Sequence, residues 1–349
     1  MNNRQPDFQN MSPVGHIYVN GYGFVNTDPR LQEERGIRRN AAVTGLALVE
    51  IFVLSALCPY AATIFINGLW ALMPLSSGYG TSLALVELRE ILSYLFSMGI
   101  PLLLTYVLLR PRRGSISLRH FPTDGTLLSY SMISSLAVMV LMSMVTGCIE
   151  RIFAYFHILE LTPDYLLPST PVALVLYIIR LSLLPALLEE LLFRGVLLRS
   201  LRQYGDAFAL VASSAAFGFI HYSITKDLSG FVIGLILGYF VIRTGSVFTA
   251  VFSRFLTLLL PLVLRLIQHI APYPVYRITE YTLYCLILAV AIGVFILICR
   301  REGNAFILSS GNTETRISRK LRAYFLNLPM FFAIVLWIIQ VFRHIHFIG

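Results

Sequence analysis

The stretch LLEELLFRGVLLRS, residues 187–200, places two adjacent glutamates and an arginine inside a run of leucine, phenylalanine and valine. A charged side chain at the centre of a bilayer costs about 2.5–3.5 kcal/mol on insertion scales, so these charges require a reason. Glu190 and Arg194 are four residues apart and can pair on one helix face. Glu189 points about 100° away from that face. A buried polar network that fixes helix register explains the pair but not Glu189, which favours a functional acid at this position.

The composition is that of a protein embedded in a membrane. Hydrophobic residues make up 57% of the 349 and charged residues only 13%, whereas soluble domains carry about a quarter charged residues. A bilayer core of about 30 Å needs about 20 apolar residues for each helical span, and several stretches meet this length. We therefore predict an all-α polytopic membrane protein with about eight to nine transmembrane helices and a buried polar chamber.

The net charge of +9 does not indicate a nucleic-acid partner in this context. The arginines stand mostly in short segments beside the apolar runs, which is the positive-inside pattern, and threading the spans alternately places the N-terminus in the cytoplasm. We expect a multi-pass protein of the cell (plasma) membrane, in contact with the lipid bilayer. The four cysteines lie in or beside apolar segments without paired spacing, which is typical of small buried residues rather than of a disulfide framework or a zinc site.

Four regions follow from the pattern of apolar runs. Residues 1–40 are expected to form a polar cytoplasmic tail and a juxtamembrane segment, 41–170 the N-terminal transmembrane helices, 171–268 the core helices that carry the opening stretch, and 269–349 the C-terminal transmembrane helices with a basic cytoplasmic loop. The predicted spans cover about 41–70, 82–109, 127–148, 171–203, 206–222, 228–243, 247–268, 281–299 and 325–341.

Three local features qualify these spans. The first is expected to be bent or broken near Pro59. The tail is expected to lack helical structure up to about Leu31, and a short juxtamembrane helix then leads to the first span. Arg316 and Lys320 belong to the polar basic loop expected before the last span.

His221 is the predicted partner of Glu189. Glu189 lies fifteen residues before Tyr204 and His221 seventeen after it, so antiparallel helices rising about 1.5 Å per residue bring both to a similar depth. Phe217, four residues before His221, is expected to pack beside its ring. A lone histidine on an apolar helix is more often a core residue, and the shared depth is what favours a site. Glutamate can take a proton from water, and histidine can ligate a metal or donate to an oxyanion.

These residues resemble the CAAX-protease and bacteriocin-processing (CPBP, or Abi) family of intramembrane proteases. Its first motif, a glutamate pair followed at fixed spacing by arginine, is matched by Glu189, Glu190 and Arg194. Its second motif, phenylalanine followed four residues later by histidine, is matched by Phe217 and His221. Two motifs at the expected separation on consecutive helices are a more specific signal than either motif alone.

The resemblance, which covers about residues 171–260, implies a CPBP-like helical core with a catalytic chamber inside the bilayer and peptide-bond hydrolysis by a glutamate-activated water. It implies that Glu189 is the general base, that Glu190 and Arg194 form a supporting ion pair, and that His221 is a ligand or an oxyanion donor. It further implies either zinc or another divalent metal, with His221 and Glu189 as ligands, or no cofactor. The implied partners are membrane-associated peptide or protein substrates.

The third motif of the family is missing. It consists of histidine and, four residues on, asparagine or aspartate, in a helix that follows a Gly-Ser start such as Gly245–Ser246. Counting forward places Arg254 at the histidine position and Leu258 at the other. Arginine is no metal ligand. Arg254 either snorkels to the interface, pairs with Glu189 or Glu190 where a metal would otherwise supply positive charge, or stabilises an oxyanion.

Three functions remain open on this basis. The first is an active intramembrane endopeptidase that uses Glu189, His221 and Arg254, with Phe217 and Leu258 in its substrate pocket. The second is a catalytically silent relative that acts as a membrane binding, immunity or scaffold protein, because pairing with Arg254 makes Glu189 a poorer base. The third is a transporter or lipid-binding protein, which the motif spacings and the lack of paired broken helices disfavour. Fold alone does not separate the first two.

Overall fold

The computed structural model describes residues 16–19, 23–26, 29–71, 79–110, 122, 124–160, 167–301, 308–309 and 315–347. Within these residues the chain is helical apart from two small antiparallel sheets. Seven of the described helices are long and apolar enough to cross a membrane, or eight if a bent pair near the C-terminus counts as one more span. The all-α polytopic membrane fold is therefore confirmed.

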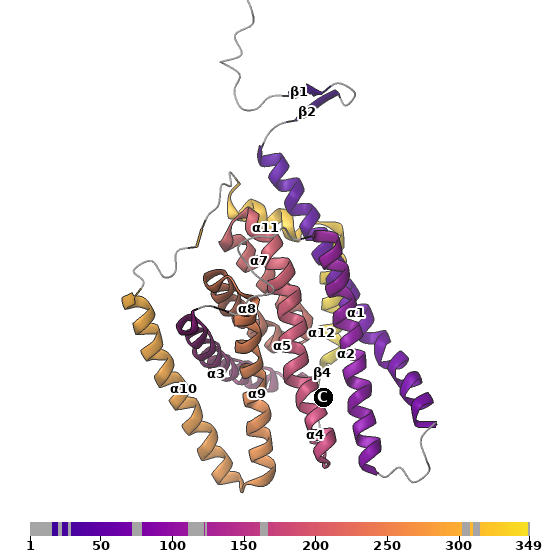
Figure 1. The fold of residues 1–349 in the computed structure, drawn as a ribbon, viewed down its shortest axis with the longest axis vertical. Coiled ribbons are helices and arrows are strands. Elements are labelled where there is room, and N and C mark those ends of the chain that lie inside the picture. Colours follow the sequence, from indigo (N-terminus) through magenta and orange to yellow (C-terminus); the bar gives the residue numbers. More distant parts are fainter. Residues whose placement is uncertain are drawn as a thin grey trace, which may run out of the picture.

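The elements follow one another in a simple order (Figure 1). The helices are α1 (Pro29–Ala71), α2 (Tyr79–Leu109), α3 (Gly125–Tyr155), α4 (Pro171–Ile178), α5 (Leu184–Glu190), α6 (Arg199–Leu201), α7 (Asp206–Gly218), α8 (Ile224–Thr244), α9 (Val247–Ile270), α10 (Tyr273–Arg301), α11 (Ile317–Phe325) and α12 (Leu328–His344). The strands are β1 (His16–Val19), β2 (Gly23–Asn26), β3 (Ile158–Glu160) and β4 (Ile345–Phe347).

The N-terminal region is more regular than predicted. β1 and β2 form an antiparallel hairpin in the tail, with Ile17 opposite Val25, while residues 1–15 lie outside the described part of the chain. α1 is a single helix of 43 residues that unites the expected juxtamembrane helix with the first span, and Pro59 lies inside it. Of the two alternatives expected near Pro59, a bend or a break, the break is wrong, because one missing backbone donor does not end a helix whose other residues must keep their hydrogen bonds in lipid.

The fourth span carries the opening stretch and is continuous from Pro171 to Tyr204. It is not a uniform α-helix, since π-helical segments at Ile179–Leu183 and Leu191–Leu198 stand on either side of α5. Such wide turns are rare in proteins and often mark functional sites. The adjacent glutamates are the last two residues of α5, at the boundary with the second wide segment.

The fifth segment is shorter than a membrane span, which corrects the prediction for it. α7 has 13 residues and is followed by the 3-10 turn Phe219–His221. The helical stretch Asp206–His221 reaches about 24 Å at about 1.5 Å per residue, less than the about 30 Å of a bilayer core. The chain then reverses at Tyr222, whose φ of 58° is left-handed, and Ser223 caps α8 through a bond from the Lys226 amide. His221 therefore stands at the end of a helical stretch that is too short to cross the bilayer.

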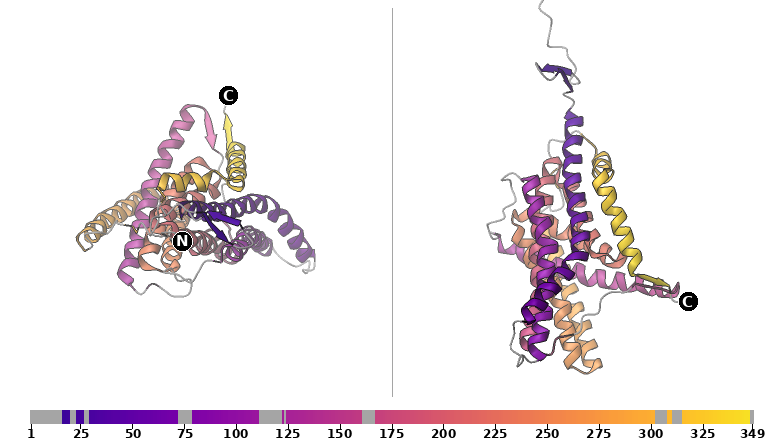
Figure 2. Two further views of the ribbon diagram at one scale, coloured as in Figure 1. Left: turned by 90° about the horizontal axis from the view of Figure 1, so that it is seen from above. Right: turned by 90° about the vertical axis from the view of Figure 1, so that its right-hand side faces the viewer.

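α3 lies across the direction of the other long helices, and its end reaches the sheet of β3 and β4 (Figure 2). The two strands are antiparallel, with Leu159 opposite His346, although the sequence predicted no strand there. Glu160 of β3 accepts hydrogen bonds from the Ile224 amide at 2.9 Å and from the Thr225 hydroxyl at 3.0 Å. This sheet thus joins the end of α3 to the start of α8 and to the C-terminal strand.

The basic loop predicted before the last span contains the helix α11, which bends by 72° into α12. Lys320 on its inner face is 2% exposed. The Lys320 ammonium lies 3.0 Å from a Glu33 carboxylate oxygen and donates to the Tyr204 carbonyl at 2.6 Å. These contacts fix α11 against α1 and against the end of the fourth span.

Candidate functional site

Glu190 and Arg194 form the ion pair that their spacing predicts. The Arg194 Nη1 donates to Glu190 Oε1 at 3.1 Å, and Arg194 Nε lies 3.1 Å from Oε2. The Arg194 Nη2 also donates to the Gly234 carbonyl of α8 at 3.3 Å, and the guanidinium lies 4.2 Å from the centre of the Phe217 ring. Both charged side chains are at most 1% exposed. A buried pair needs such additional partners to offset its loss of water.

Glu189 receives its partners from two other helices. The Tyr94 hydroxyl of α2 donates to Glu189 Oε1 at 2.8 Å. The Arg254 Nη2 of α9 donates to Glu189 Oε2 at 3.2 Å, and the two charged side chains are only 7% and 8% exposed. Each carboxylate oxygen thus accepts one charge-assisted hydrogen bond, which fixes the plane of the carboxylate.

His221 joins the same cluster through its Nε2 atom, whereas its Nδ1 atom faces the backbone of its own helix. Its Nδ1 lies 3.1 Å from the Gly218 carbonyl, which can only accept, so Nδ1 carries the proton. Nε2 then faces Arg254 Nη2 at 3.4 Å as an acceptor. The structure therefore brings Glu189, His221 and Arg254 together, as the hairpin spacing and the motif counting predict, and it leaves the imidazole neutral.

Arg254 is deeply buried, so it does not snorkel to the membrane surface. Its residue is 6% exposed, and its Nε has no hydrogen-bond partner among the described residues. The guanidinium also lies 5.1 Å from the centre of the Phe217 ring. Of the two carboxylates considered, it pairs with Glu189.

Phe217 is the packing centre of the cluster. Its ring is fully buried and meets the rings of Phe193 and His221 edge-on, each at 5.2 Å between centroids. The guanidiniums of Arg194 and Arg254 both lie against this ring. Leu258 is half-buried on α9. The substrate-pocket role of Phe217 and Leu258 stays a prediction.

Glycines of α8 set the distance between the helices that carry the site. A Cβ atom at Gly230 would lie 2.8 Å from His221 Cε1 and 2.9 Å from its Nδ1. At Gly234 it would lie 3.2 Å from Arg194 Nη2. Small residues four apart allow membrane helices to approach closely. A larger side chain at Gly230 would therefore displace His221, whereas at Gly234 the neighbouring side chains would have to give by a few tenths of an ångström.

The donor set at this cluster does not fit a zinc ion. Zinc requires at least three protein ligands, whereas Glu189 and His221 supply two donors here. No group of three or more His, Cys, Asp or Glu side chains able to hold a metal occurs within the described residues. The Arg254 guanidinium contacts both candidate ligands and would repel a cation between them. This donor set therefore does not support a metal-dependent step.

Sequence reasoning missed two parts of the cluster. Tyr94 lies in an apolar run of α2, 95 residues before Glu189 in the sequence, and nothing in the local sequence marks it as the partner of a glutamate. Gly230 and Gly234 do carry a signal, because glycines four residues apart in an apolar segment are typical of close helix packing. Which residues they would face could not be read from that spacing.

The comparisons agree with the two sequence motifs. Residues 171–260 match the family described as type II CAAX prenyl endopeptidase Rce1-like. Neither a curated protein nor a solved structure gives a significant match. The matched segment covers less than half of the chain and holds Glu189, His221 and Arg254. Over residues 171–260, therefore, the chain is similar to the type II CAAX prenyl endopeptidase family.

Proposed function

We propose that the protein is an intramembrane endopeptidase of the CAAX prenyl type, in which Glu189 activates the attacking water. The observation that carries this proposal is the contact of a buried glutamate, oriented by Tyr94, with Arg254, which in turn contacts His221. A carboxylate oriented away from bulk water can serve as a general base. A neighbouring guanidinium can receive developing negative charge. The family match supports a membrane-anchored, prenylated peptide as substrate.

The proposed reaction is a direct hydrolysis. Water attacks the scissile carbonyl carbon while the Glu189 carboxylate takes one of its protons. The carbonyl oxygen becomes a tetrahedral oxyanion, which Arg254 stabilises by charge and by hydrogen-bond donation. Glu189 then gives the proton to the amide nitrogen, the C–N bond breaks, and a carboxylic acid and an amine leave. One water is consumed, and Glu189 returns to its ionised form.

His221 holds Arg254 in this scheme and does not donate to the oxyanion. Its proton lies on Nδ1 and is bound by the Gly218 carbonyl, so Nε2 offers only a lone pair. Arg254 takes the electrophilic role that the family resemblance assigns to histidine. The Glu190–Arg194 pair supports the helix end that presents Glu189.

The second candidate is a silent relative that binds prenylated or other membrane peptides. One observation favours it: both oxygens of Glu189 already accept hydrogen bonds, one of them from a guanidinium. A carboxylate oxygen already engaged by a guanidinium is less accessible to an attacking water. In the enzyme, Arg254 must move from Glu189 toward the substrate carbonyl on binding, whereas in a silent relative it stays in place.

Cleavage of a membrane-anchored prenylated peptide reporter by the purified protein in liposomes tests the proposal. Glu189→Gln should lower the rate at least about 100-fold, since a general base contributes about 10²–10⁴-fold. Glu150→Gln, which changes an exposed glutamate at the end of α3, is the matched control and should leave the rate unchanged. Equal cleavage by the Glu189→Gln protein and the wild type would remove Glu189 from the mechanism.

Substitutions at Arg254 separate the two candidates. In the enzyme, Arg254→Ala should slow cleavage about 10²–10³-fold, the usual cost of one oxyanion donor. In a silent relative the wild type cleaves nothing, and Arg254→His with Leu258→Asn, which rebuilds the third motif, should create activity. Wild-type cleavage that Arg254→Ala leaves intact would contradict the role given to Arg254.

A further inference from the structure

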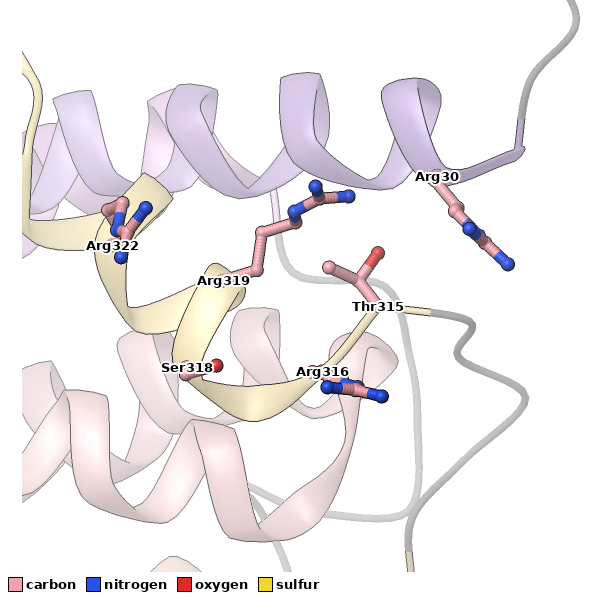
Figure 3. Close-up of a pocket in the computed structure, with 6 residues that line it drawn as sticks. All are labelled: Arg30, Thr315, Arg316, Ser318, Arg319 and Arg322. Carbon is pink, nitrogen blue, oxygen red and sulfur yellow. The ribbon is translucent and has the colours of Figure 1, made fainter.

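A second charged feature lies near the start of α1, apart from the buried cluster. It is a cavity of about 470 Å³ between the first turn of α1 and the start of α11 (Figure 3). Its lining residues are Arg30, Thr315, Arg316, Ser318, Arg319 and Arg322. Among the described residues that line it, four are arginines and none is acidic.

The described carboxylates near this cavity are engaged elsewhere or form only an exposed ion pair. Glu33 accepts from the Thr315 hydroxyl at 2.8 Å and pairs with the buried Lys320 at 3.0 Å. Glu34 lies 3.5 Å from Arg319, whose side chain is 62% exposed, and such surface pairs contribute little. Glu33 is thus committed to fixing α11 in place, and among the described residues the arginines of the cavity outnumber the carboxylates beside them.

Two of the arginines are open to an incoming anion. Arg316 and Arg322 are exposed, and neither forms an ion pair with any residue that the structure describes. Arg316 directly precedes α11, so the cavity also faces the amides of a helix N-terminus, which carry partial positive charge. Guanidinium groups bind phosphate oxygens in a bidentate manner, which favours a phosphate over a neutral ligand.

The position of α11 suits a lipid headgroup. α12 is an apolar helix, and the 72° bend between the two places α11 close to the membrane plane when α12 crosses the bilayer. Exposed apolar side chains lie at both ends of α11, with Ile317 50% and Leu326 68% exposed. A helix with basic residues on one side and exposed apolar residues beside them is typical of the membrane interface. A cavity beside such a helix is therefore suited to the phosphate of a lipid headgroup.

A neighbouring basic cavity of about 680 Å³ is a weaker candidate for an anion-binding site. It is lined by Arg39, Arg110, Arg199 and Arg202 among others. There Asp206 is part of the lining and accepts two hydrogen bonds from Arg202, at 2.6 and 3.1 Å. An acidic side chain in the wall makes that cavity a poorer match for an anion.

We propose that the cavity between α1 and α11 binds a phosphate group, presented by an anionic lipid headgroup such as that of phosphatidic acid. Arg316 and Arg322 bind the phosphate oxygens, and the Ser318 hydroxyl and the N-terminus of α11 add further donors. The site holds the end of the molecule where α1 begins against an anionic membrane surface. The same chemistry would accept free phosphate, so the experiment separates the two sources.

Native mass spectrometry of the full-length protein in neutral detergent measures this binding. The probes are dioctanoyl phosphatidic acid, dioctanoyl phosphatidylcholine and inorganic phosphate. Each arginine near an anionic membrane contributes about 1 kcal/mol, so Arg316→Ala with Arg322→Ala should weaken phosphatidic acid binding about 30-fold. Arg151→Ala with Arg343→Ala removes the same charge from exposed positions outside the cavity and should change it little.

The outcomes are distinct. Wild-type binding of phosphatidic acid over phosphatidylcholine, lost in the Arg316/Arg322 variant and resistant to millimolar phosphate, supports a lipid headgroup. Binding of phosphate with equal strength supports the same site with a soluble ligand. Unchanged phosphatidic acid binding in the Arg316/Arg322 variant overturns the proposal, as does equal binding of the two lipids. Arg316→Lys with Arg322→Lys keeps the charge and should lose less binding than the alanine pair, although lysine cannot bind in a bidentate manner.

Discussion

Removing the charge of Arg254 should expose how strongly the central ion pair holds the helices together. Arg254→Met leaves the Glu189 carboxylate, only 8% exposed, with the Tyr94 hydroxyl as its remaining hydrogen-bond donor among the described residues. Breaking a buried pair costs about 3–5 kcal/mol in soluble proteins. Polar pairs between membrane helices are worth about 0.6 kcal/mol on average and at most about 1.7, because unfolded helices find other partners in the bilayer. For a charged pair we expect a loss between these ranges, about 2 kcal/mol.

A double-mutant cycle isolates the pair from other effects of each substitution. Glu189→Gln, Arg254→Met and the combined variant are unfolded with denaturing detergent in mixed micelles, and helix loss is followed by circular dichroism. The combined variant should cost less than the sum of the single changes, with a coupling energy of about 1.5 kcal/mol. Independent sites add within about 0.3–0.5 kcal/mol. A coupling energy below that limit would refute the argument that the 3.2 Å contact stabilises the helix arrangement.

Three further predictions concern the surroundings of the site. Gly230→Ala places a Cβ 2.8 Å from His221 and should destabilise the protein by about 1–3 kcal/mol. Gly293→Ala is the control, because its Cβ meets no atom within 4 Å and should not destabilise the protein. Equal thermal unfolding of the two variants would contradict this prediction. Trp337→Phe loses the 2.6 Å bond from the indole to Asp227 and should lower the unfolding free energy by about 1.5–3 kcal/mol, and an unchanged value would show that bond to be unimportant. Elemental analysis of the purified protein should find well under one zinc per chain, and stoichiometric zinc would contradict the arginine–carboxylate pairing.

The fold class could be predicted because it depends on quantities that a sequence states directly. Apolar runs of sufficient length must form helices in lipid, where every backbone group needs an internal partner. The predictions that were wrong concern features that depend on contacts between distant parts of the chain. α7 is shorter than a span because the chain reverses after His221. The basic segment contains a helix, α11, which the buried ion pair of Lys320 with Glu33 holds against α1.

Some contacts of the site could also be predicted, because they too depend on spacings that the sequence states directly. Contacts within one helix follow from its period, so the Glu190–Arg194 pair could be derived from four-residue spacing. The meeting of Glu189 with His221 needed only the length of two helices joined by a short turn. Tyr94 could not be found, since residues 95 positions apart in the chain share no local pattern.

The sequence by itself determined that charge is buried in a membrane helix and that the residue at the third motif is a cation. Only the tertiary structure decided that Arg254 contacts Glu189 and His221 together, and that Gly230 of α8 lets His221 approach that helix closely. The physical reason is that a charge in lipid must find a partner, which composition reveals. Which partner it finds depends on how several helices pack, and no single helix contains that information.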